Sequence, residues 1–250
     1  MLLSIRNVWF KYPKSEWILK NLSADLTAGF YCLIGRNGSG KTTLLRLIAG
    51  MLKPKKGYVV VCGKRVRSYK DVIGKIIYLP SNPSTFLVGP KIRDDFEKAG
   101  VGEDLIDFFA ARKIMEKKIF EASEGERRLA AIITALAYNT DIVLLDEVTV
   151  GLDKGLRGKL VSALRSFGRK KIILLATNDF RIIPFCDEVL LLKEGRISVR
   201  GKPEDIIDEV PYLSANQTIR IYRTLIQRGA DLELDKKDIL KVLVNLLCST

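Results

Sequence analysis

The stretch Gly-Arg-Asn-Gly-Ser-Gly-Lys-Thr-Thr at residues 35–43 constrains this chain more than any other segment. It follows an apolar run over 30–34 that predicts a buried strand, and it precedes a run over 44–49 that predicts a helix. A G-x-x-x-x-G-K-[ST] loop between a strand and a helix is typical of sites that hold the phosphates of a nucleotide. The chain is therefore expected to bind a nucleoside triphosphate.

Each residue type in this loop has a physical reason to be there. Glycine lets the backbone bring its N–H groups close to a polyphosphate, and the N-terminus of the following helix favours negative charge. Lys41 can reach the β- and γ-phosphates, and the Thr42 hydroxyl can ligate Mg²⁺. A chance glycine-rich loop is the alternative, which the flanking strand and helix argue against. The predicted nucleotide-binding residues of the loop are Gly35, Asn37, Gly38, Ser39, Gly40, Lys41, Thr42 and Thr43.

Length and composition indicate one large domain, or a domain with an appendage. The chain has 250 residues, of which 47% are hydrophobic, and no apolar run reaches the roughly 18 residues that span a bilayer. The N-terminus lacks the layout of a signal peptide, so we expect a cytosolic protein or one attached from the cytosolic side. Four cysteines lie far apart without a C-x-x-C pair, so no zinc or redox motif is predicted, and Cys32 is expected to be ordinary core.

The formal net charge is +13, and part of it is concentrated over residues 53–75. That segment holds eight Lys or Arg against one acid, Asp71. It could attract anionic lipid headgroups or nucleic acid, but a solvated, charge-rich surface is the interpretation we favour. The chain contains no histidine.

The order of elements predicts an α/β protein. Strand-like segments occupy 3–10, 17–26, 30–34, 58–61 and 76–79, and residues 91–138 read mostly as helix. Apolar runs over 142–145 and 171–176 suit a parallel sheet buried on both faces, with a helix over 154–168 between them. A hairpin over 187–199 turns at 194–195, and the chain turns helical from about 203.

Two carboxylates end the strand that begins near Asp141. Asp146 is placed to hold Mg²⁺ directly or through water, and Glu147 can polarise a water that attacks the γ-phosphate. Asp146 follows Lys41 by 105 residues, and Glu147 is the next residue. Both carboxylates are therefore assigned to the nucleotide site.

The order of motifs resembles that of ATP-binding-cassette (ABC) ATPases. The resemblance runs from about residue 2 to about 210 and rests on the phosphate loop, Ala122-Ser123-Glu124-Gly125-Glu126, Asp146-Glu147, Gly151-Leu152-Asp153 and Ala176-Thr177-Asn178-Asp179. It implies a P-loop NTPase fold with a mixed sheet core, an antiparallel β subdomain, an inserted helical subdomain at about 82–138 and a short helical C-terminal tail. The expected boundaries are 1–215 for the ATPase domain and 216–250 for a helical appendage.

The resemblance also implies a head-to-tail dimer with two ATP molecules between the subunits. Tyr12 matches the aromatic residue that stacks on adenine, although an exposed tyrosine before a proline turn is an equal alternative. Ser123 and Gly125 match the signature segment, and Asp153 matches a residue that faces the partner's site. From the residues alone, Ser123 with Glu126 is a capping box and Asp153 is an N-cap; each can serve both purposes.

Three positions depart from the family pattern. Ser81 stands where a glutamine is usual, and its hydroxyl is too short to reach Mg²⁺ as the longer amide does. Glu124 stands in the signature where a glycine is usual. Asn178 replaces the histidine that contacts the γ-phosphate, and an amide keeps a donor but cannot carry charge. We therefore expect slow hydrolysis, with Glu147, Lys41 and Asn178 as the catalytic residues.

The predicted function is that of an ATP-binding and ATP-hydrolysing subunit of an ABC membrane transporter, peripheral on the cytosolic face of the membrane. The segment 78–86 and Asp94-Asp95 are most similar to energy-coupling-factor and cobalt-type importers. The expected cofactors are ATP and Mg²⁺. The expected partners are a transmembrane permease and a second ABC ATPase, identical or different, with no nucleic acid. A soluble single-cassette assembly factor and a weakly hydrolysing regulatory subunit are the alternatives.

Overall fold

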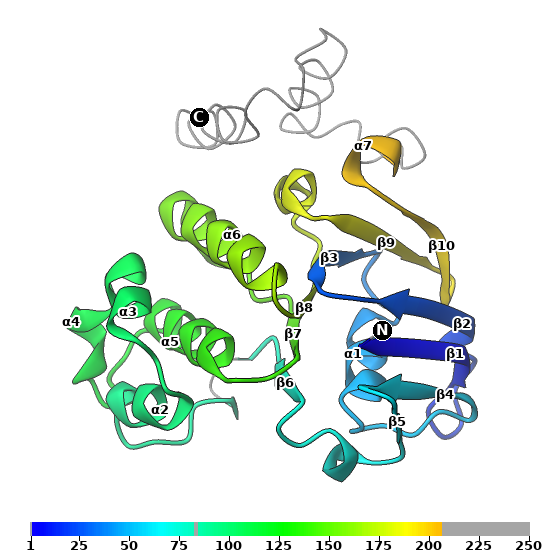
Figure 1. Ribbon diagram of the computed structural model, residues 1–250, viewed down its shortest axis with the longest axis horizontal. Helices are drawn as coiled ribbons and strands as arrows, with labels where there is room; N and C mark the ends of the chain where they lie inside the picture. The colour runs from blue at the N-terminus through cyan, green and yellow to red at the C-terminus, as the bar shows by residue number, and fades with distance from the viewer. Residues whose placement is uncertain (1, 83–84, 207–250) are drawn as a thin grey trace, which may run out of the picture.

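The computed structural model describes residues 2–82 and 85–206, which form two sheets and the helices around them (Figure 1). The smaller sheet is antiparallel, with strand order β2-β1-β4-β5. Its strands are β1 (Leu3–Phe10), β2 (Leu19–Leu26), β4 (Lys56–Val61) and β5 (Lys64–Val66).

The larger sheet has the order β10-β9-β3-β8-β7-β6. Neighbours from β9 to β6 pair in parallel, and β10 adds an antiparallel edge. Every residue of β3, β7 and β8 is buried, as expected for parallel strands that are covered on both faces. The strands are β3 (Gly29–Ile34), β6 (Ile76–Leu79), β7 (Ile142–Asp146), β8 (Ile172–Ala176), β9 (Glu188–Lys193) and β10 (Arg196–Gly201).

Helix α1 (Lys41–Ile48) lies between the two sheets. Its Leu44, Leu45 and Ile48 belong to one buried cluster with residues of β1 and β2 and with Leu33 and Leu174 of the larger sheet. Because α1 directly follows the phosphate loop, this packing on both sides fixes the N-terminus of the helix at the carboxyl ends of the parallel strands.

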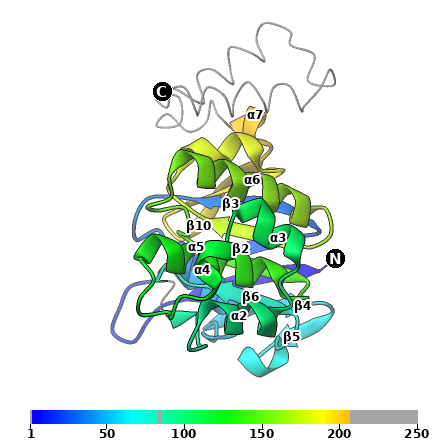
Figure 2. The same cartoon turned by 90° about the vertical axis from the view of Figure 1, so that its left-hand side faces the viewer.

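The opposite face of the larger sheet is covered by helices α5 (Glu124–Ala137) and α6 (Lys154–Gly168) and by the 3-10 helix η3 (Phe180–Phe185). Three shorter helices pack beside α5 and form the helical side of the molecule (Figure 2). They are α2 (Ile92–Ala99), α3 (Glu103–Phe109) and α4 (Arg112–Met115). The short elements η1 (Tyr69–Asp71) and α7 (Pro203–Ile206) complete the described part.

The predicted α/β fold with an antiparallel sheet and a mixed sheet is confirmed, including the helix over 154–168 and the hairpin that turns at 194–195. Strand β5 was missed, because its three residues Lys64–Val66 are mostly polar and carry no strand-like alternation. The predicted appendage over 216–250, and the boundary at 215, lie outside the described residues. The limits of the helical insert stay a prediction.

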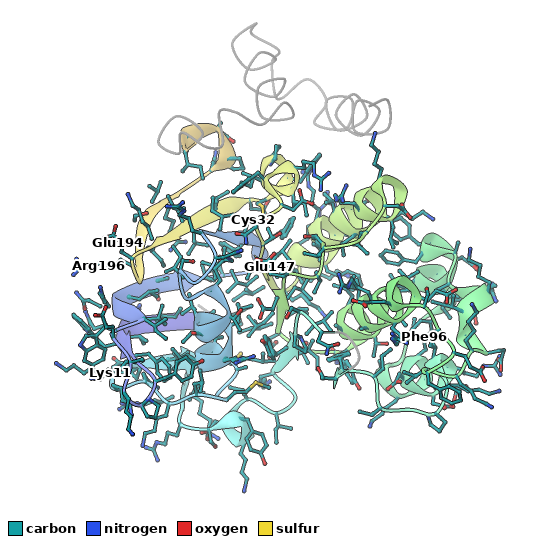
Figure 3. The ribbon with its side chains drawn as sticks, turned by 180° about the vertical axis from the view of Figure 1, so that it is seen from behind. Lys11, Cys32, Phe96, Glu147, Glu194 and Arg196 are labelled. Carbon is teal, nitrogen blue, oxygen red and sulfur yellow. A yellow bond between two sulfur atoms is a disulfide. The ribbon has the colours of Figure 1, made fainter. Side chains whose placement is uncertain are left out.

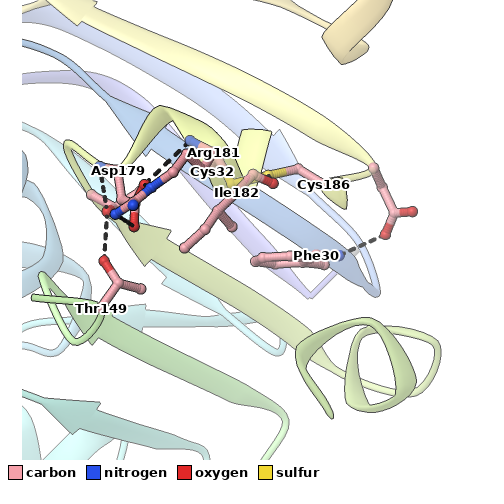
Figure 4. Close-up of a disulfide and its surroundings, with 9 residues drawn as sticks. Phe30, Cys32, Thr149, Asp179, Arg181, Ile182 and Cys186 are labelled. Carbon is pink, nitrogen blue, oxygen red and sulfur yellow. Dashed lines mark hydrogen bonds and ion pairs between the residues drawn. A yellow bond between two sulfur atoms is a disulfide. The ribbon is translucent and has the colours of Figure 1, made fainter. Parts of the chain in front are cut away.

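The expectation that Cys32 is ordinary core is wrong in one respect. The side chain is buried in β3, but it forms a disulfide with Cys186 just before β9, with a Cα–Cα distance of 6.1 Å (Figure 4). The parallel pairing of β3 with β9 brings the two residues together across 154 positions of sequence. A search for closely spaced cysteines could not find such a pair. Cys62 is free and exposed.

Candidate functional site

At two glycines of the phosphate loop, the backbone conformation or the neighbouring atoms leave no room for a side chain. Gly40, which precedes α1, has φ 105°, a conformation that L-residues with a side chain rarely adopt. At Gly35, a β-carbon would collide with the carbonyl of Leu192 and would lie 2.7 Å from the Ser39 hydroxyl. The loop therefore curls tightly onto the end of β9, with the N-terminus of α1 at its centre.

The loop also holds a hydroxyl without a partner. The Oγ of Ser39 is buried and makes no hydrogen bond within the described residues. Buried hydroxyls normally find a partner, so this one is suited to a ligand oxygen. Together with the cradle at Gly35 and the helix N-terminus, it fits a phosphate group.

Lys41 is almost fully buried, with 6% of its surface exposed. Its Nζ donates to the carbonyl of Gly35 at 2.8 Å and to the Asn178 Oδ1 at 3.1 Å, and it lies 3.6 Å from the Glu147 Oε1. These contacts join the phosphate loop to the residues that follow β7 and β8. A buried ammonium held among acceptors is ready to meet the oxygens of a phosphate.

Glu147 directly follows β7 and has φ 51°, a positive value that is uncommon outside glycine. Its Oε2 accepts a hydrogen bond from the backbone N–H of Asn178 at 3.1 Å. The side-chain amide of Asn178 also donates to the Asn37 Oδ1. Figure 3 places Glu147 near the middle of the molecule, between the side that carries Lys11 and the side that carries Phe96. The carboxylate of Glu147 lies beside Lys41 of the phosphate loop, with 3.6 Å between the Oε1 and the Nζ.

Asp146 is the last residue of β7 and has 1% of its surface exposed. The Thr42 hydroxyl donates to its Oδ1 at 3.1 Å, and the Tyr78 hydroxyl donates to its Oδ2 at 3.1 Å. Burial and the adjacent Asp146 raise the pKa of Tyr78 to about 12. The tyrosine thus stays protonated as a donor.

The pair Thr42 and Asp146 is a small set of hard oxygen donors. In the described residues there is no group of three or more His, Cys, Asp or Glu that could hold a metal. Mg²⁺ is usually bound by one or two carboxylates together with substrate phosphates and water, rather than by a cage of protein ligands. The site fits Mg²⁺ that arrives with a nucleotide.

Tyr12 follows β1 and packs edge-to-face on Phe10, with ring centroids 5.0 Å apart. Its hydroxyl lies beside Arg46 on α1, whose pKa is raised by hydrogen bonds first to Tyr78 and then to Tyr12. Tyr12 also packs against the buried cluster that includes residues of α1, so the aromatic residue predicted to contact adenine lies near the phosphate-loop helix.

The predicted signature residues begin α5. Ser123 accepts a hydrogen bond from the Glu126 N–H at 3.2 Å and donates its own N–H to the Glu126 carboxylate at 2.9 Å, so the predicted capping box is confirmed. Glu124 has 69% of its side chain exposed and pairs with Arg128 at 2.9 Å. Among the described residues, a β-carbon at Gly125 would meet nothing within 4 Å, so the start of α5 is unobstructed at this position.

Asp153 caps α6 by accepting a hydrogen bond from the Leu156 N–H at 2.8 Å, which confirms that role. The following turn of α6 carries Arg157, which donates to the Leu152 carbonyl at 2.8 Å and lies 3.0 Å from the Asp179 carboxylate. Asp179 adjoins Asn178, so this ion pair ties the loop before α6 to the loop after β8.

The structure thus brings the phosphate loop, Asp146, Glu147 and Asn178 together at one edge of the sheet. Across the described residues, no hydrogen bond or ion pair joins Ser123, Gly125 or Asp153 to that loop. Ser81 is exposed, two residues after the end of β6. Residues 53–75 lie around β4, β5 and η1, where Arg65 stacks on Tyr58 and Lys64 pairs with Asp71.

Sequence reasoning missed Tyr78, Arg46, Arg128 and Arg157. The hydroxyl of Tyr78 in an otherwise apolar strand was a usable signal, because β6 neighbours β7 and ends at the same edge. The three arginines gave no signal, because most of their partners are backbone carbonyls or side chains of other elements: Arg46 lies beside Tyr78 and Tyr12, and Arg157 pairs with Asp179. None of the helices in the described ranges is long and apolar enough to cross a bilayer.

Comparison with known proteins agrees with this arrangement. The family model for ABC transporters matches residues 19–150. A putative ABC transporter ATP-binding protein of Pyrococcus abyssi is 32% identical, over 82% of this chain and 85% of its own length. The energy-coupling factor transporter ATP-binding protein EcfA1 of Ligilactobacillus salivarius is also 32% identical, over 92% of this chain and 90% of its own.

Solved structures share the fold at lower identity. CbiO1 from Clostridium perfringens, part of the ABC transporter complex CbiONQ, superposes with a TM-score of 0.70 at 23% identity, covering 90% of this chain and 98% of that one. A dimeric ATP-binding cassette in a post-hydrolysis state, bound to ADP and Pi, gives 0.71 at 21% identity, with 81% and 99% covered. The matched family model and the two relatives at 32% identity show that the chain belongs to the ABC transporter family, as an ATP-binding and ATP-hydrolysing subunit.

Proposed function

We propose that this chain binds MgATP at the edge of its larger sheet and hydrolyses it to drive a separate membrane subunit. The observation that carries the proposal is the meeting of three elements at Lys41: its ammonium contacts the phosphate loop, Asn178 and Glu147. Gly35, Gly38, Gly40, Asn37, Ser39 and Thr43 form the rest of the phosphate cradle, and Tyr12 contacts the base.

Thr42 and Asp146 hold Mg²⁺ in this proposal, and the ion supplies positive charge to the phosphates when bound. Glu147 accepts a proton from the attacking water, which needs its carboxylate to be ionised and close to the γ-phosphate. Asn178 offers an uncharged amide donor to the same phosphate. Because this donor is weaker than a cationic imidazole, we expect slow turnover.

The second half of each ATP site comes from a partner ATPase. Ser123, Gly125 and Asp153 are proposed to contact the nucleotide held by that partner. The exposed start of α5 supports this, as does the similarity, at a TM-score of 0.71, to a cassette that is dimeric when bound to ADP and Pi. A partner with a regular signature would complete this chain's own site, at Lys41 and Glu147, without a carboxylate near the γ-phosphate. Only the partner's site would then face Glu124, so a heterodimer is the assembly we favour.

The membrane subunit is proposed to dock on the helical side of the molecule. Val88 and Phe120 are 70% and 77% exposed, and they line a groove of about 360 Å³ with Leu87 and Ile119. An apolar patch of this kind suits an apolar helix of a permease. The relatives named as energy-coupling-factor ATP-binding proteins support an importer of that type and a position on the cytosolic face of the membrane.

The catalytic assignment is tested by phosphate release from ATP. Glu147→Gln should abolish turnover while ATP binding persists, because the amide cannot accept the proton from water. Glu194→Gln, at the β9–β10 turn, is the matched control and should keep the parent rate. Parent-level turnover in Glu147→Gln would refute the general-base role.

The docking assignment is tested by fractionating cells that co-express the chain with its permease. Val88→Ala with Phe120→Ala should move the chain from membranes to the soluble fraction, because the pair supplies the exposed apolar contact. Ile73→Ala, which truncates a side chain of similar exposure elsewhere, should stay with the membranes. A double variant that remains membrane-bound would contradict this surface.

A further inference from the structure

Tyr78 donates a hydrogen bond to a carboxylate of the proposed metal site. Its hydroxyl donates to the Asp146 Oδ2 at 3.1 Å. A carboxylate oxygen accepts hydrogen bonds, so the tyrosine hydroxyl is the donor of this pair. Tyr78 is half-buried in β6, which pairs in parallel with β7, so the contact joins two neighbouring strands.

The carboxylate of Asp146 is thereby held at both oxygens. Thr42 from the phosphate-loop helix donates to Oδ1, and Tyr78 from β6 donates to Oδ2. Each oxygen keeps a further acceptor position, since a carboxylate has about four in all. The two donors therefore fix the orientation of the group and leave it free to bind a cation.

We propose that Tyr78 is a positioning residue that orients Asp146 for Mg²⁺. The inference rests on the proposed MgATP site. Residues that hydrogen-bond a metal ligand commonly contribute about 10- to 100-fold in metal affinity. Tyr78→Phe removes the hydroxyl and keeps the ring, so its effect should fall on the metal-dependent part of ATP binding.

The test measures ATP affinity by calorimetry in the Glu147→Gln background, once with Mg²⁺ and once with EDTA. We expect Tyr78→Phe to weaken ATP binding about tenfold or more with Mg²⁺ and less than about twofold in EDTA. Tyr69→Phe, which removes an exposed hydroxyl in η1, should change neither value. In the Asp146→Asn background, Tyr78→Phe should have no further effect, which a purely structural role would not produce.

The possible outcomes distinguish a failure of the Tyr78 role from a failure of the proposed MgATP site. If the parent binds ATP equally well with Mg²⁺ and EDTA, the Mg²⁺ site itself is wrong. If the parent depends on Mg²⁺ but Tyr78→Phe matches it in both conditions, the positioning role is overturned. An equal loss in both conditions also overturns it, because the hydroxyl would then act on the nucleotide or the fold rather than on the metal carboxylate.

Discussion

The carboxylate of Glu124 should oppose ATP-driven pairing of two copies of this chain, and neutralising it should strengthen that pairing. In the proposed head-to-tail dimer, the start of α5 would approach the γ-phosphate held by the partner. A full charge roughly 5 Å from one phosphate charge costs about 3 kcal/mol at an effective dielectric near 20, and about 1 kcal/mol in water.

The structure indicates that this electrostatic cost is nearer the value of about 1 kcal/mol for charges in water. Glu124 is 69% exposed, and Arg128 lies 2.9 Å from its carboxylate and offsets part of its field. About 1 kcal/mol at each of two sites gives about 2 kcal/mol per homodimer, which is roughly thirtyfold in the dissociation constant. The loss of the exposed i,i+4 pair costs only about 0.3–0.5 kcal/mol of helix stability.

The assay is sedimentation velocity of Glu147→Gln protein with MgATP, comparing Glu124 with Glu124→Gln. The variant should dimerise about thirtyfold more tightly at low salt, and the gain should shrink at high salt because exposed charges are screened. Glu103→Gln, which neutralises an exposed carboxylate at the start of α3, is the control. Homodimers that Glu124→Gln does not strengthen would refute the reasoning and remove the main argument for a heterodimer.

Three further outcomes follow from the site and the core. Asn178→His should raise ATP turnover at least about tenfold, because one preorganised contact to developing charge commonly changes the rate by about 10²–10³-fold. An unchanged steady-state rate would contradict the role of residue 178. Reduction of the Cys32–Cys186 disulfide should lower the free energy of unfolding by about 5 kcal/mol, because the bond closes a loop of about 154 residues. Urea titrations with and without dithiothreitol measure this difference, and Cys186→Ala should abolish the response to dithiothreitol. Arg157→Ala should destabilise the fold by about 3 kcal/mol, which is the low end for breaking a buried ion pair, because Arg181 still pairs with Asp179. A change under about 1 kcal/mol in the same titrations would show that the Arg157–Asp179 pair contributes little to stability.

The part of the site that sequence could predict is the part that follows from strand order. Asp146 and the phosphate loop each come at the carboxyl end of an apolar strand, and parallel strands place those ends at one edge. The hydrogen bond between Thr42 and Asp146 is the direct result. The capping box at Ser123 was equally predictable, because its partners lie three residues apart.

The remainder depends on which strands and helices become neighbours. Tyr78 contacts Asp146 because β6 pairs with β7, and Cys32 contacts Cys186 because β3 pairs with β9. The spacing of residues along the sequence does not indicate either strand pairing. The pairing of Glu124 with Arg128 is an i,i+4 contact that the helix pattern allowed, but the sequence did not indicate whether the carboxylate faced solvent.

The most direct test of the central claim is the ATP affinity of Lys41→Ala, measured by calorimetry with Mg²⁺. Removing the buried ammonium takes away charge-assisted contacts worth about 1.5–3 kcal/mol each, so ATP should bind at least about a hundredfold more weakly. Lys53→Ala, which removes an exposed cation outside the site, should bind as the parent does. Parent-strength binding in Lys41→Ala would contradict the assignment of this loop as the nucleotide site.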